Sequence, residues 1–200
     1  MSYEMFSNNM CVRELCGVTN GLLMGESMPE SWKRSTVVPL YKGKGNVLEC
    51  SNYCTVKLLE HGMKVVECVF EKRLRKMVEI IEEQYRFVAG KETIDAIFIT
   101  KQLQEKYLQN DNELYLVFVD LEKAFDKVPR VLIESSLRRK GAVECYMKAV
   151  MKRYQEVRSQ VKVEGEDSKE FAVTVGIHQG LILSPFIFAV VMDVVSEEEA

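Results

Sequence analysis

A short apolar run that ends in an aspartate constrains the fold of this chain more than any other feature. Residues 116–119 read Leu-Val-Phe-Val, with no polar residue among them, and Asp120 follows. An uninterrupted run rich in β-branched residues is typical of a strand covered on both faces, as in sheets that carry helices on each side. The run therefore predicts an α/β fold with an inner strand that ends at Asp120.

Asp120 is the first candidate for a functional residue. An ionised carboxylate is costly to bury, so an aspartate at the end of a covered strand needs an explanation. It is solvated at the sheet edge, hydrogen-bonded to a loop as a strand terminator or helix cap, or bound to a divalent cation. The residues beside it leave these three alternatives open.

Composition limits the class of protein. The chain has 200 residues, 47% of them hydrophobic, and a net charge of -3, which allows a sizeable core but lacks the overall basic signature of a nucleic-acid binder. The start has no secretory pattern, and the most apolar segment, residues 181–195, contains Ser184, Pro185 and Asp193 and is too short to span a bilayer. We expect an intracellular protein, cytoplasmic or nuclear, with reduced cysteines.

Charge is concentrated in one part of the chain. Residues 31–76 contain ten Lys and Arg against four Glu, a net charge of +6. This density favours a surface that faces phosphates, and ordinary solvated helix faces explain it equally well. The basic candidates for nucleic-acid binding are Lys64, Lys72, Arg73, Arg75 and Lys76.

Hydrophobic periodicity predicts the other elements. We expect helices over residues 12–24, 63–81, 93–109, 129–140, 142–156 and 186–195, a strand over 36–41, and a hairpin from 157–163 and 170–175. Pro39 predicts that the first strand lies near a sheet edge. Thr93 is expected to cap its helix and Asp95 to favour the helix dipole. The Lys-Gly-Lys-Gly-Asn turn at 42–46 lacks the ending of a phosphate-binding loop.

Three segments resemble one known family. Residues 118–129, Phe-Val-Asp-Leu-Glu-Lys-Ala-Phe-Asp-Lys-Val-Pro, resemble the first catalytic motif of reverse transcriptases from non-LTR (LINE-like) retrotransposons. The segment 32–59 resembles their fingers entry, and Gly-Ile-His-Gln-Gly-Leu-Ile-Leu-Ser-Pro at 176–185 resembles their second palm motif. The resemblance implies the fingers-palm portion of a right-hand polymerase with an incomplete palm sheet. Its parts are an N-terminal helical segment (1–30), a fingers-like region (31–113) and a partial palm (114–200).

The resemblance also implies roles for individual residues. The Asp120 carboxylate and the Leu121 carbonyl bind magnesium, and Phe125 lies under the sugar of the incoming nucleotide. Gln179 and Gly180 position template and nucleotide. Mg²⁺ prefers oxygen ligands, which the Asp120 carboxylate and the Leu121 carbonyl supply. A bulky ring at Phe125 would clash with the 2′-hydroxyl of a ribose, which fits a deoxynucleotide substrate. The implied partners are an RNA template, a DNA primer and deoxynucleoside triphosphates.

The chain departs from the family pattern at several positions. Cys54 stands where the family has an arginine that reaches the triphosphate, and a thiol cannot replace a guanidinium there. Lys57 compensates if its side chain points inward, and is solvated if it points outward. Arg86 replaces a glycine, which costs about 1 kcal/mol if the backbone there is left-handed or tightly approached. His178 has no pairing residue in the sequence and is not expected to be a catalytic base.

Polymerase chemistry on two metal ions needs more than one carboxylate. The family supplies a further pair from a Tyr/Phe-Ala-Asp-Asp hairpin beyond the second palm motif, and the 200 residues contain no such pair. The sequence therefore predicts a fragment of a magnesium-dependent RNA-directed DNA polymerase that is inactive alone, which leaves its status as an enzyme open. The alternatives are a non-catalytic nucleic-acid-binding remnant and an unstable degenerate copy.

Overall fold

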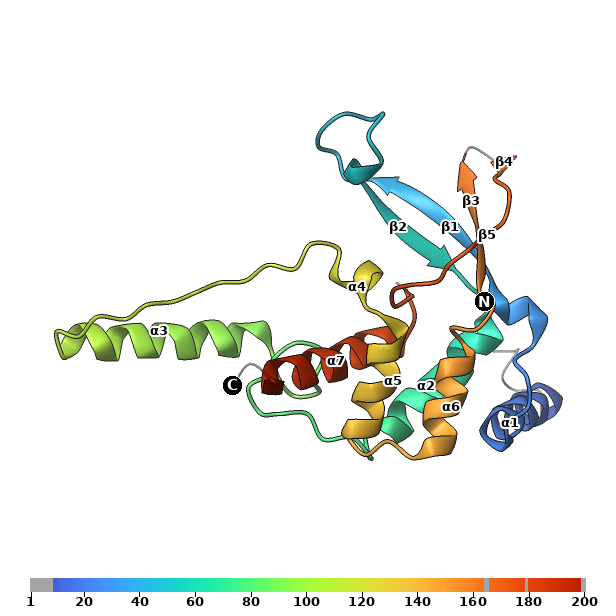
Figure 1. Cartoon of the computed structure of the whole chain (residues 1–200), viewed down its shortest axis with the longest axis horizontal. Coiled ribbons are helices and arrows are strands. Elements are labelled where there is room, and N and C mark those ends of the chain that lie inside the picture. Colours follow the sequence, from blue (N-terminus) through green and yellow to red (C-terminus); the bar gives the residue numbers. More distant parts are fainter. Residues whose placement is uncertain (1–8, 164–165, 179, 199–200) are drawn as a thin grey trace.

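A five-stranded sheet and a group of helices make up the computed structural model, which describes residues 9–163, 166–178 and 180–198 (Figure 1). The helices are α1 (Asn9–Met24), α2 (His61–Leu74), α3 (Thr93–Gln109), α4 (Ala124–Lys127), α5 (Arg130–Arg139), α6 (Glu144–Lys152) and α7 (Ser184–Glu198). Short 3₁₀ turns, η2 (Glu30–Lys33) and η3 (Cys50–Asn52), precede the first two strands. The mixture of helices and sheet confirms the predicted α/β class.

The sheet has the strand order β2-β1-β3-β4, with β5 also paired to β3. Its strands are β1 (Arg34–Tyr41), β2 (Tyr53–Leu58), β3 (Arg158–Val163), β4 (Glu166–Asp167) and β5 (Phe171–Ala172). β1 runs antiparallel to β2 and parallel to β3, and β3 pairs antiparallel with β4 and β5. The hairpin expected from 157–163 and 170–175 is therefore confirmed.

Pro39 does not mark an edge strand, because β1 lies between β2 and β3. The pairing of β1 with β3 ends at Val37, opposite Val161, so Pro39 lies beyond it. On its other side Pro39 stands opposite Thr55 of β2. A residue without an N–H is tolerated there because no hydrogen bond to β3 is required of it.

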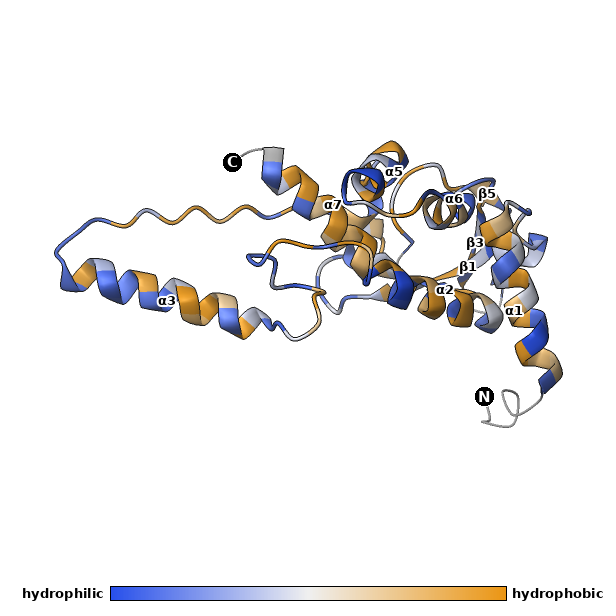
Figure 2. Ribbon diagram, turned by 90° about the horizontal axis from the view of Figure 1, so that it is seen from below, coloured by the Kyte–Doolittle hydropathy of each residue, from blue (hydrophilic) through white to orange (hydrophobic). Residues whose placement is uncertain are grey.

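The core lies between α2, α5, α6 and α7. Its fully buried side chains include Phe70 and Leu74 of α2, Ile133 and Leu137 of α5, Met147 and Val150 of α6, and Phe186 and Ile187 of α7. α5 packs against α6 and α7, and α1 packs against α6 and α2. Figure 2 shows the hydrophobic residues that follow α2 and α7 through this core. The apolar pattern of residues 146–154 is core, as predicted.

Several helix ends and one cap differ from the expectation: α1 begins at Asn9 instead of residue 12, and α6 ends at Lys152 instead of residue 156. α2 ends at Leu74 instead of near residue 81, because the chain tightens into turns in which Lys76 and Met77 N–H groups donate to Arg73 and Leu74 carbonyls. At α3 the residue before the helix is Glu92, and its N–H donates to the Asp95 carboxylate over 2.8 Å. Thr93 is thus the first helical residue and not the cap, whereas Asp95 is structural as expected.

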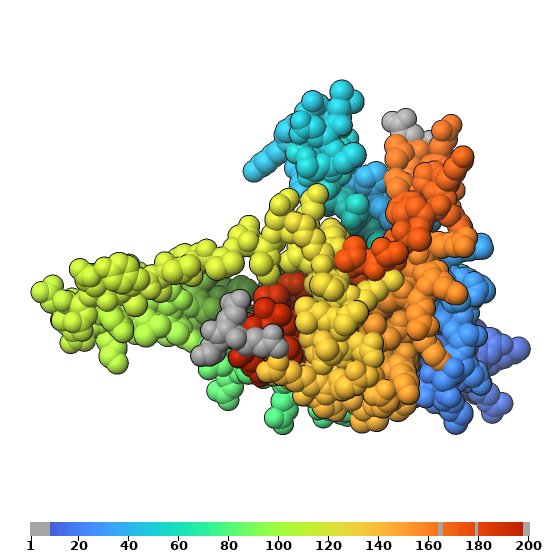
Figure 3. All heavy atoms as spheres, viewed as in Figure 1, coloured from blue at the N-terminus to red at the C-terminus, as the bar shows by residue number. Residues whose placement is uncertain are grey.

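The largest departure concerns the segment before Asp120. α3 and residues 110–122 project from the helical body and return to it (Figures 1 and 3). Residues 113–121 lie in no helix or strand, and Val117, Phe118 and Val119 are each more than 80% exposed. The predicted inner strand is therefore wrong for the described part of the chain. An apolar run indicates side chains that are stable only when they are buried. The described residues neither pack over this run nor pair with it as a strand.

Candidate functional site

Two segments far apart in the sequence are joined through their backbones. The Ile177 N–H donates to the Phe125 carbonyl over 2.7 Å, and the Gly176 N–H donates to the Val128 carbonyl over 3.0 Å. Gly176 has φ +87°, and a Cβ there would lie 2.6 Å from the Asp126 carbonyl oxygen. Glycine is required at this contact, and the contact holds α4 against the start of the 176–185 segment.

Asp120 and Leu121 lie at the end of the projecting segment, and both are exposed. They line a hollow of about 650 Å³, together with the start of α5 and the side chains of Phe188, Val191 and Val195 from α7. Most of this lining is apolar. Among the described residues, no group of three His, Cys, Asp or Glu side chains is placed to hold a metal ion. Asp120 therefore faces a hollow, and the part of the chain that the structure describes places no cluster of carboxylates around it.

The Phe125 ring packs in an aromatic cluster. It stacks on Phe188 of α7, with ring centroids 4.3 Å apart and planes 17° apart, and meets Phe87 edge-on at 6.1 Å. Phe125 is half-buried. A residue at the candidate sugar position is thus fixed by packing on the helix that follows the second motif.

The departure at Arg86 does not strain the backbone. The left-handed conformation falls on the next residue, Phe87, with φ 63°, and Arg86 is outside the left-handed region. The Arg86 guanidinium lies 4.9 Å from the centre of the Phe87 ring. The left-handed backbone on which the expected penalty depends is therefore absent at position 86, and the left-handed residue is the aromatic that joins the Phe125 cluster.

Lys57 lies beside the second motif. It stands opposite the buried Val37 in the β1–β2 ladder, whereas Cys54 stands opposite the exposed Leu40. Because side chains alternate along a strand, Lys57 points to the inner face of the sheet and Cys54 to the outer face. Burial lowers the pKa of Lys57, and the nearby Asp126 charge opposes this effect. Lys57 is thus a half-buried cation near the joined motifs.

Gly180 completes this arrangement. It has φ +89°, and a Cβ there would lie 3.4 Å from the Lys57 carbonyl oxygen. The turn that contains Gly180 therefore passes directly over β2. Gln179, the other member of the predicted pair, lies outside the described residues.

His178 is a buried residue with an unusual environment. It is 3% exposed, and its ring lies 5.2 Å from the Tyr154 ring. Burial lowers the pKa of His178 to about 2, and the charges of Lys57, Arg153 and Arg130 act in the same direction. Neither ring nitrogen has a hydrogen-bond partner among the described residues. A neutral, enclosed imidazole of this kind packs in the core and is poorly suited to proton transfer.

The basic candidates on and after α2 do not share one role. The Arg73 guanidinium donates to the Tyr146 hydroxyl over 2.8 Å. Arg75 contacts Glu71, donates to the Phe87 carbonyl and lies 4.8 Å from the centre of the Phe186 ring. Lys72 and Lys76 are exposed, and Lys64 is half-buried. Two of the five candidates therefore hold the fold together, and Lys72 and Lys76 remain available to solvent.

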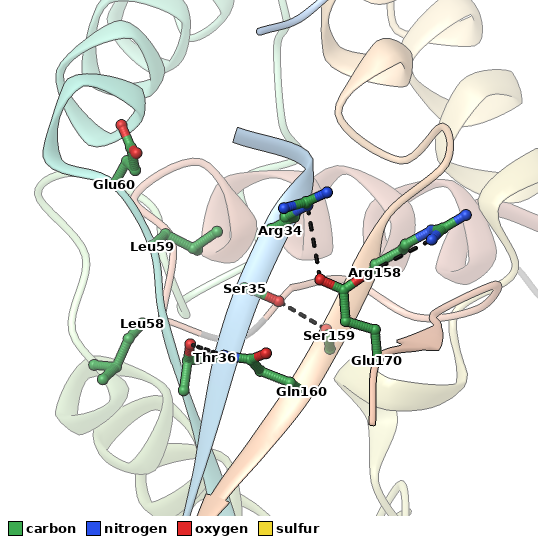
Figure 4. A pocket seen from close by; sticks show the side chains of 10 residues that line it. All are labelled: Arg34, Ser35, Thr36, Leu58, Leu59, Glu60, Arg158, Ser159, Gln160 and Glu170. Atoms are coloured by element: carbon green, nitrogen blue, oxygen red, sulfur yellow. Dashed lines mark hydrogen bonds and ion pairs between the residues drawn. The ribbon is translucent and has the colours of Figure 1, made fainter. Parts of the chain in front are cut away.

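A second hollow, of about 380 Å³, opens at the base of β1 and β3 (Figure 4). Arg34 and Arg158 stand side by side there, and each lies 3.7 Å from the Glu170 carboxylate. The Ser35 and Ser159 hydroxyls are 2.7 Å apart beneath them. Both arginines share one acidic partner, so this hollow offers less positive charge than its residue types suggest.

Comparison with known proteins identifies the family. Residues 42–199 match the model of the reverse transcriptase (RNA-dependent DNA polymerase) family. The chain belongs to this reverse transcriptase family. The match spans both joined motifs and β2, so the predicted resemblance is confirmed at the family level.

The curated relatives agree with this assignment. The chain is 24% identical over 86% of its length to a probable RNA-directed DNA polymerase from transposon BS of Drosophila melanogaster, of which it covers 19%. It is 26% identical over 86% of its length to a Pol polyprotein of retrotransposable element R2 from Popillia japonica, of which it covers 24%. The RNA-directed DNA polymerase of the mobile element jockey, from Drosophila melanogaster, is 22% identical over 86% of this chain.

The chain spans about a fifth to a quarter of the length of these relatives. The chain is thus a reverse transcriptase region of the kind found in non-LTR retrotransposon polymerases, as the motifs predicted. It corresponds to part of the length of such a polymerase. In the described ranges, no helix combines the length and the apolar character needed to cross a bilayer.

Sequence reasoning missed two residues that shape the site. Glu67 of α2 and Arg153, just after α6, are both buried and contact one another. Glu67 lies on the buried face of α2 with Met63 and Phe70, and Arg153 follows α6 three residues after the buried Val150. A single charge within an apolar stripe is the signal that could have found them.

Proposed function

We propose that this chain forms the nucleotide-binding side of a non-LTR retrotransposon reverse transcriptase. Residues 31–113 correspond to the fingers, 114–200 to part of the palm, and 1–30 to an N-terminal helical segment. The observation that carries the proposal is the junction of three segments: Ile177 hydrogen-bonds to Phe125, and Gly180 lies over Lys57 of β2. A triphosphate placed at this junction meets the half-buried cation of Lys57.

The parent reaction is the magnesium-dependent addition of deoxynucleotides to a DNA primer on an RNA template. In this assignment Phe125 lies under the incoming sugar, held by Phe188. Gln179 and Gly180 position the template and the nucleotide. Lys57 takes over the phosphate contact that the arginine at position 54 makes in the family, because Cys54 faces away.

The magnesium site is incomplete in the residues that are described. Mg²⁺ prefers six oxygen ligands in octahedral geometry, and usually combines one or two carboxylates with phosphates and waters. Asp120 and the Leu121 carbonyl supply two ligands, and no cluster of three candidate side chains occurs in the described ranges. The residues present do not fit a resident pair of metal ions. The chain alone is therefore proposed to bind nucleotide without joining it to a primer.

A second candidate function is nucleic-acid binding without catalysis. It is favoured by Lys72 and Lys76, which are exposed at the end of α2 and in the turn after it. Such binding is electrostatic, weakly selective for sequence and strongly dependent on salt.

The third alternative, an unstable relic, is favoured by the exposed apolar side chains of residues 116–119. It predicts that heating produces no cooperative melting transition.

The chain is also proposed to act inside the cell, cytoplasmic or nuclear. All six cysteines are free, at positions 11, 16, 50, 54, 68 and 145. Free thiols are typical of proteins from reducing compartments.

Template-directed nucleotide binding tests the main proposal. A fluorescent DNA primer annealed to RNA is titrated with the chain in Mg²⁺, with either the complementary or a non-complementary deoxynucleoside triphosphate. The proposal predicts a tighter complex with the complementary nucleotide only. Equal affinity with both nucleotides favours the non-catalytic binding function, and failure to bind the primer-template at low salt rejects both functions.

A further inference from the structure

A buried ion pair links α2 to the residue that follows α6, close to the turn that contains Gly180. Glu67 of α2 is 1% exposed and contacts the guanidinium of Arg153, which is 3% exposed. Removing two charges from water is costly, and an apolar pair of similar volume often stabilises a protein as well or better. Stability alone therefore does not account for a charged pair at this position.

The Glu67 carboxylate has a second set of partners. Its Oε2 accepts a hydrogen bond from the Ile182 N–H over 3.2 Å. Burial raises the pKa of Glu67, and the Arg153 charge and the Ile182 and Leu183 N–H groups oppose this effect. Ser184 closes the same turn from the other end, because its hydroxyl donates to the His178 carbonyl over 2.6 Å. The 178–184 turn is thus anchored at its far end by a side chain of α2.

The anchored turn is the one that lies on β2. Gly180 comes two residues before Ile182, and a Cβ on it would lie 3.4 Å from the Lys57 carbonyl oxygen. Arg153 also lies near the start of the turn: burial lowers the pKa of His178, and the Arg153 charge adds to this effect. α2, α6 and β2 are therefore connected to one another through this turn.

We infer that Glu67 is a positioning residue for the incoming deoxynucleotide. Arg153 orients the Glu67 carboxylate, and the carboxylate fixes the Ile182 amide. This amide in turn holds Gly180 at a constant distance from Lys57. The inference rests on the proposed nucleotide site, and it assigns to the pair a geometric role distinct from its contribution to stability.

Two double variants separate these roles. Glu67→Gln/Arg153→Met removes both charges but keeps an amide oxygen that accepts from Ile182. Glu67→Leu/Arg153→Met removes both charges and the acceptor. Both variants avoid a lone buried charge, so both are expected to melt cooperatively. Amide hydrogen exchange at Ile182 and Leu183 is measured together with the affinity for the complementary nucleotide on the primer-template.

The Gln/Met variant is expected to keep wild-type protection and affinity within about twofold. The Leu/Met variant is expected to lose about tenfold in nucleotide affinity and in protection at Ile182, because the Ile182 N–H loses its acceptor. Equal protection and affinity in both variants overturn the inference. If the wild type binds no nucleotide while the difference in protection persists, the anchoring stands and the proposed function fails.

Discussion

The Ile177 N–H donates to the Phe125 carbonyl over 2.7 Å and joins the first catalytic motif to the second palm motif, two of the three segments that resemble the family. The next residue toward the N-terminus, Gly176, passes so close to Asp126 that no side chain fits. Gly176 therefore belongs to a family motif and is also the residue that the close backbone contact requires.

Substitution of Gly176 tests this junction. Gly176→Ala is expected to lower the free energy of unfolding by about 3 kcal/mol, from the left-handed φ and the clash with the Asp126 carbonyl. Gly43→Ala is the matched control, since Gly43 has φ +72° but no atom lies within 4 Å of the place that an alanine methyl group would take. It should cost about 1 kcal/mol. Urea unfolding measures both, and equal losses would show that the Gly176 contact is loose.

The buried His178 predicts a pH-dependent stability. Its pKa is lowered from 6.5 to about 2, so the unfolded chain binds a proton that the folded chain excludes. Stability is therefore expected to fall as the pH drops below 6.5, by about 2 kcal/mol between pH 7 and pH 5. His178→Gln should remove this part of the loss, whereas His61→Gln, at the exposed start of α2, should keep it. Guanidinium unfolding at pH 7 and pH 5 measures the free energy of unfolding of both variants. If His178→Gln loses as much stability between these pH values as the wild type, the assignment to His178 is contradicted.

Lys57 is predicted to contact the triphosphate. Lys57→Gln should weaken binding of the complementary nucleotide about tenfold, the effect of losing roughly 1.4 kcal/mol from a charge-assisted contact. Lys162→Gln is the matched control, because the register of β3 places Lys162 on the opposite face of the sheet. Equilibrium titration on the primer-template measures both. Similar losses in the two variants would point to a general charge effect.

The exposed lysines of α2 and the turn after it are predicted to carry part of the nucleic-acid affinity. The double variant Lys72→Gln/Lys76→Gln should reduce the slope of log affinity against log salt by about 1.5. The control is Lys101→Gln/Lys106→Gln on the exposed face of α3. Titrations at several salt concentrations give the slopes. If the two double variants change the slope equally, binding is not localised to the α2 surface.

Much of the fold could be predicted from local patterns. Apolar periodicity and helix start and stop signals located α1, α2, α3, α5, α6 and α7, and alternation located β1 and the hairpin that starts with β3. The same reasoning failed at residues 116–119, since an apolar run indicates a need for cover and does not say where the cover comes from. It also placed Pro39 at an edge, because strand order depends on pairing over long distances in the sequence.

The site was predictable in part. The motifs brought out Asp120, Phe125 and Gly180, and strand alternation decides the direction of Lys57 once the register of β1 and β2 is known. The link from Glu67 through Ile182 to Gly180 could not be predicted, because it joins three elements whose contact depends on the tertiary fold. The contacts of Arg73 and Arg75 could not be predicted for the same reason, since their partners come from distant segments.

Primer extension tests the central claim, that this chain holds the nucleotide side of the site but only one of the carboxylates needed for catalysis. Purified wild-type chain and Asp120→Ala are incubated with Mg²⁺, an RNA template, a DNA primer and all four deoxynucleoside triphosphates. We predict no extension by either protein, although the wild type binds the complementary nucleotide. Extension by the wild type that is lost in Asp120→Ala would contradict the account.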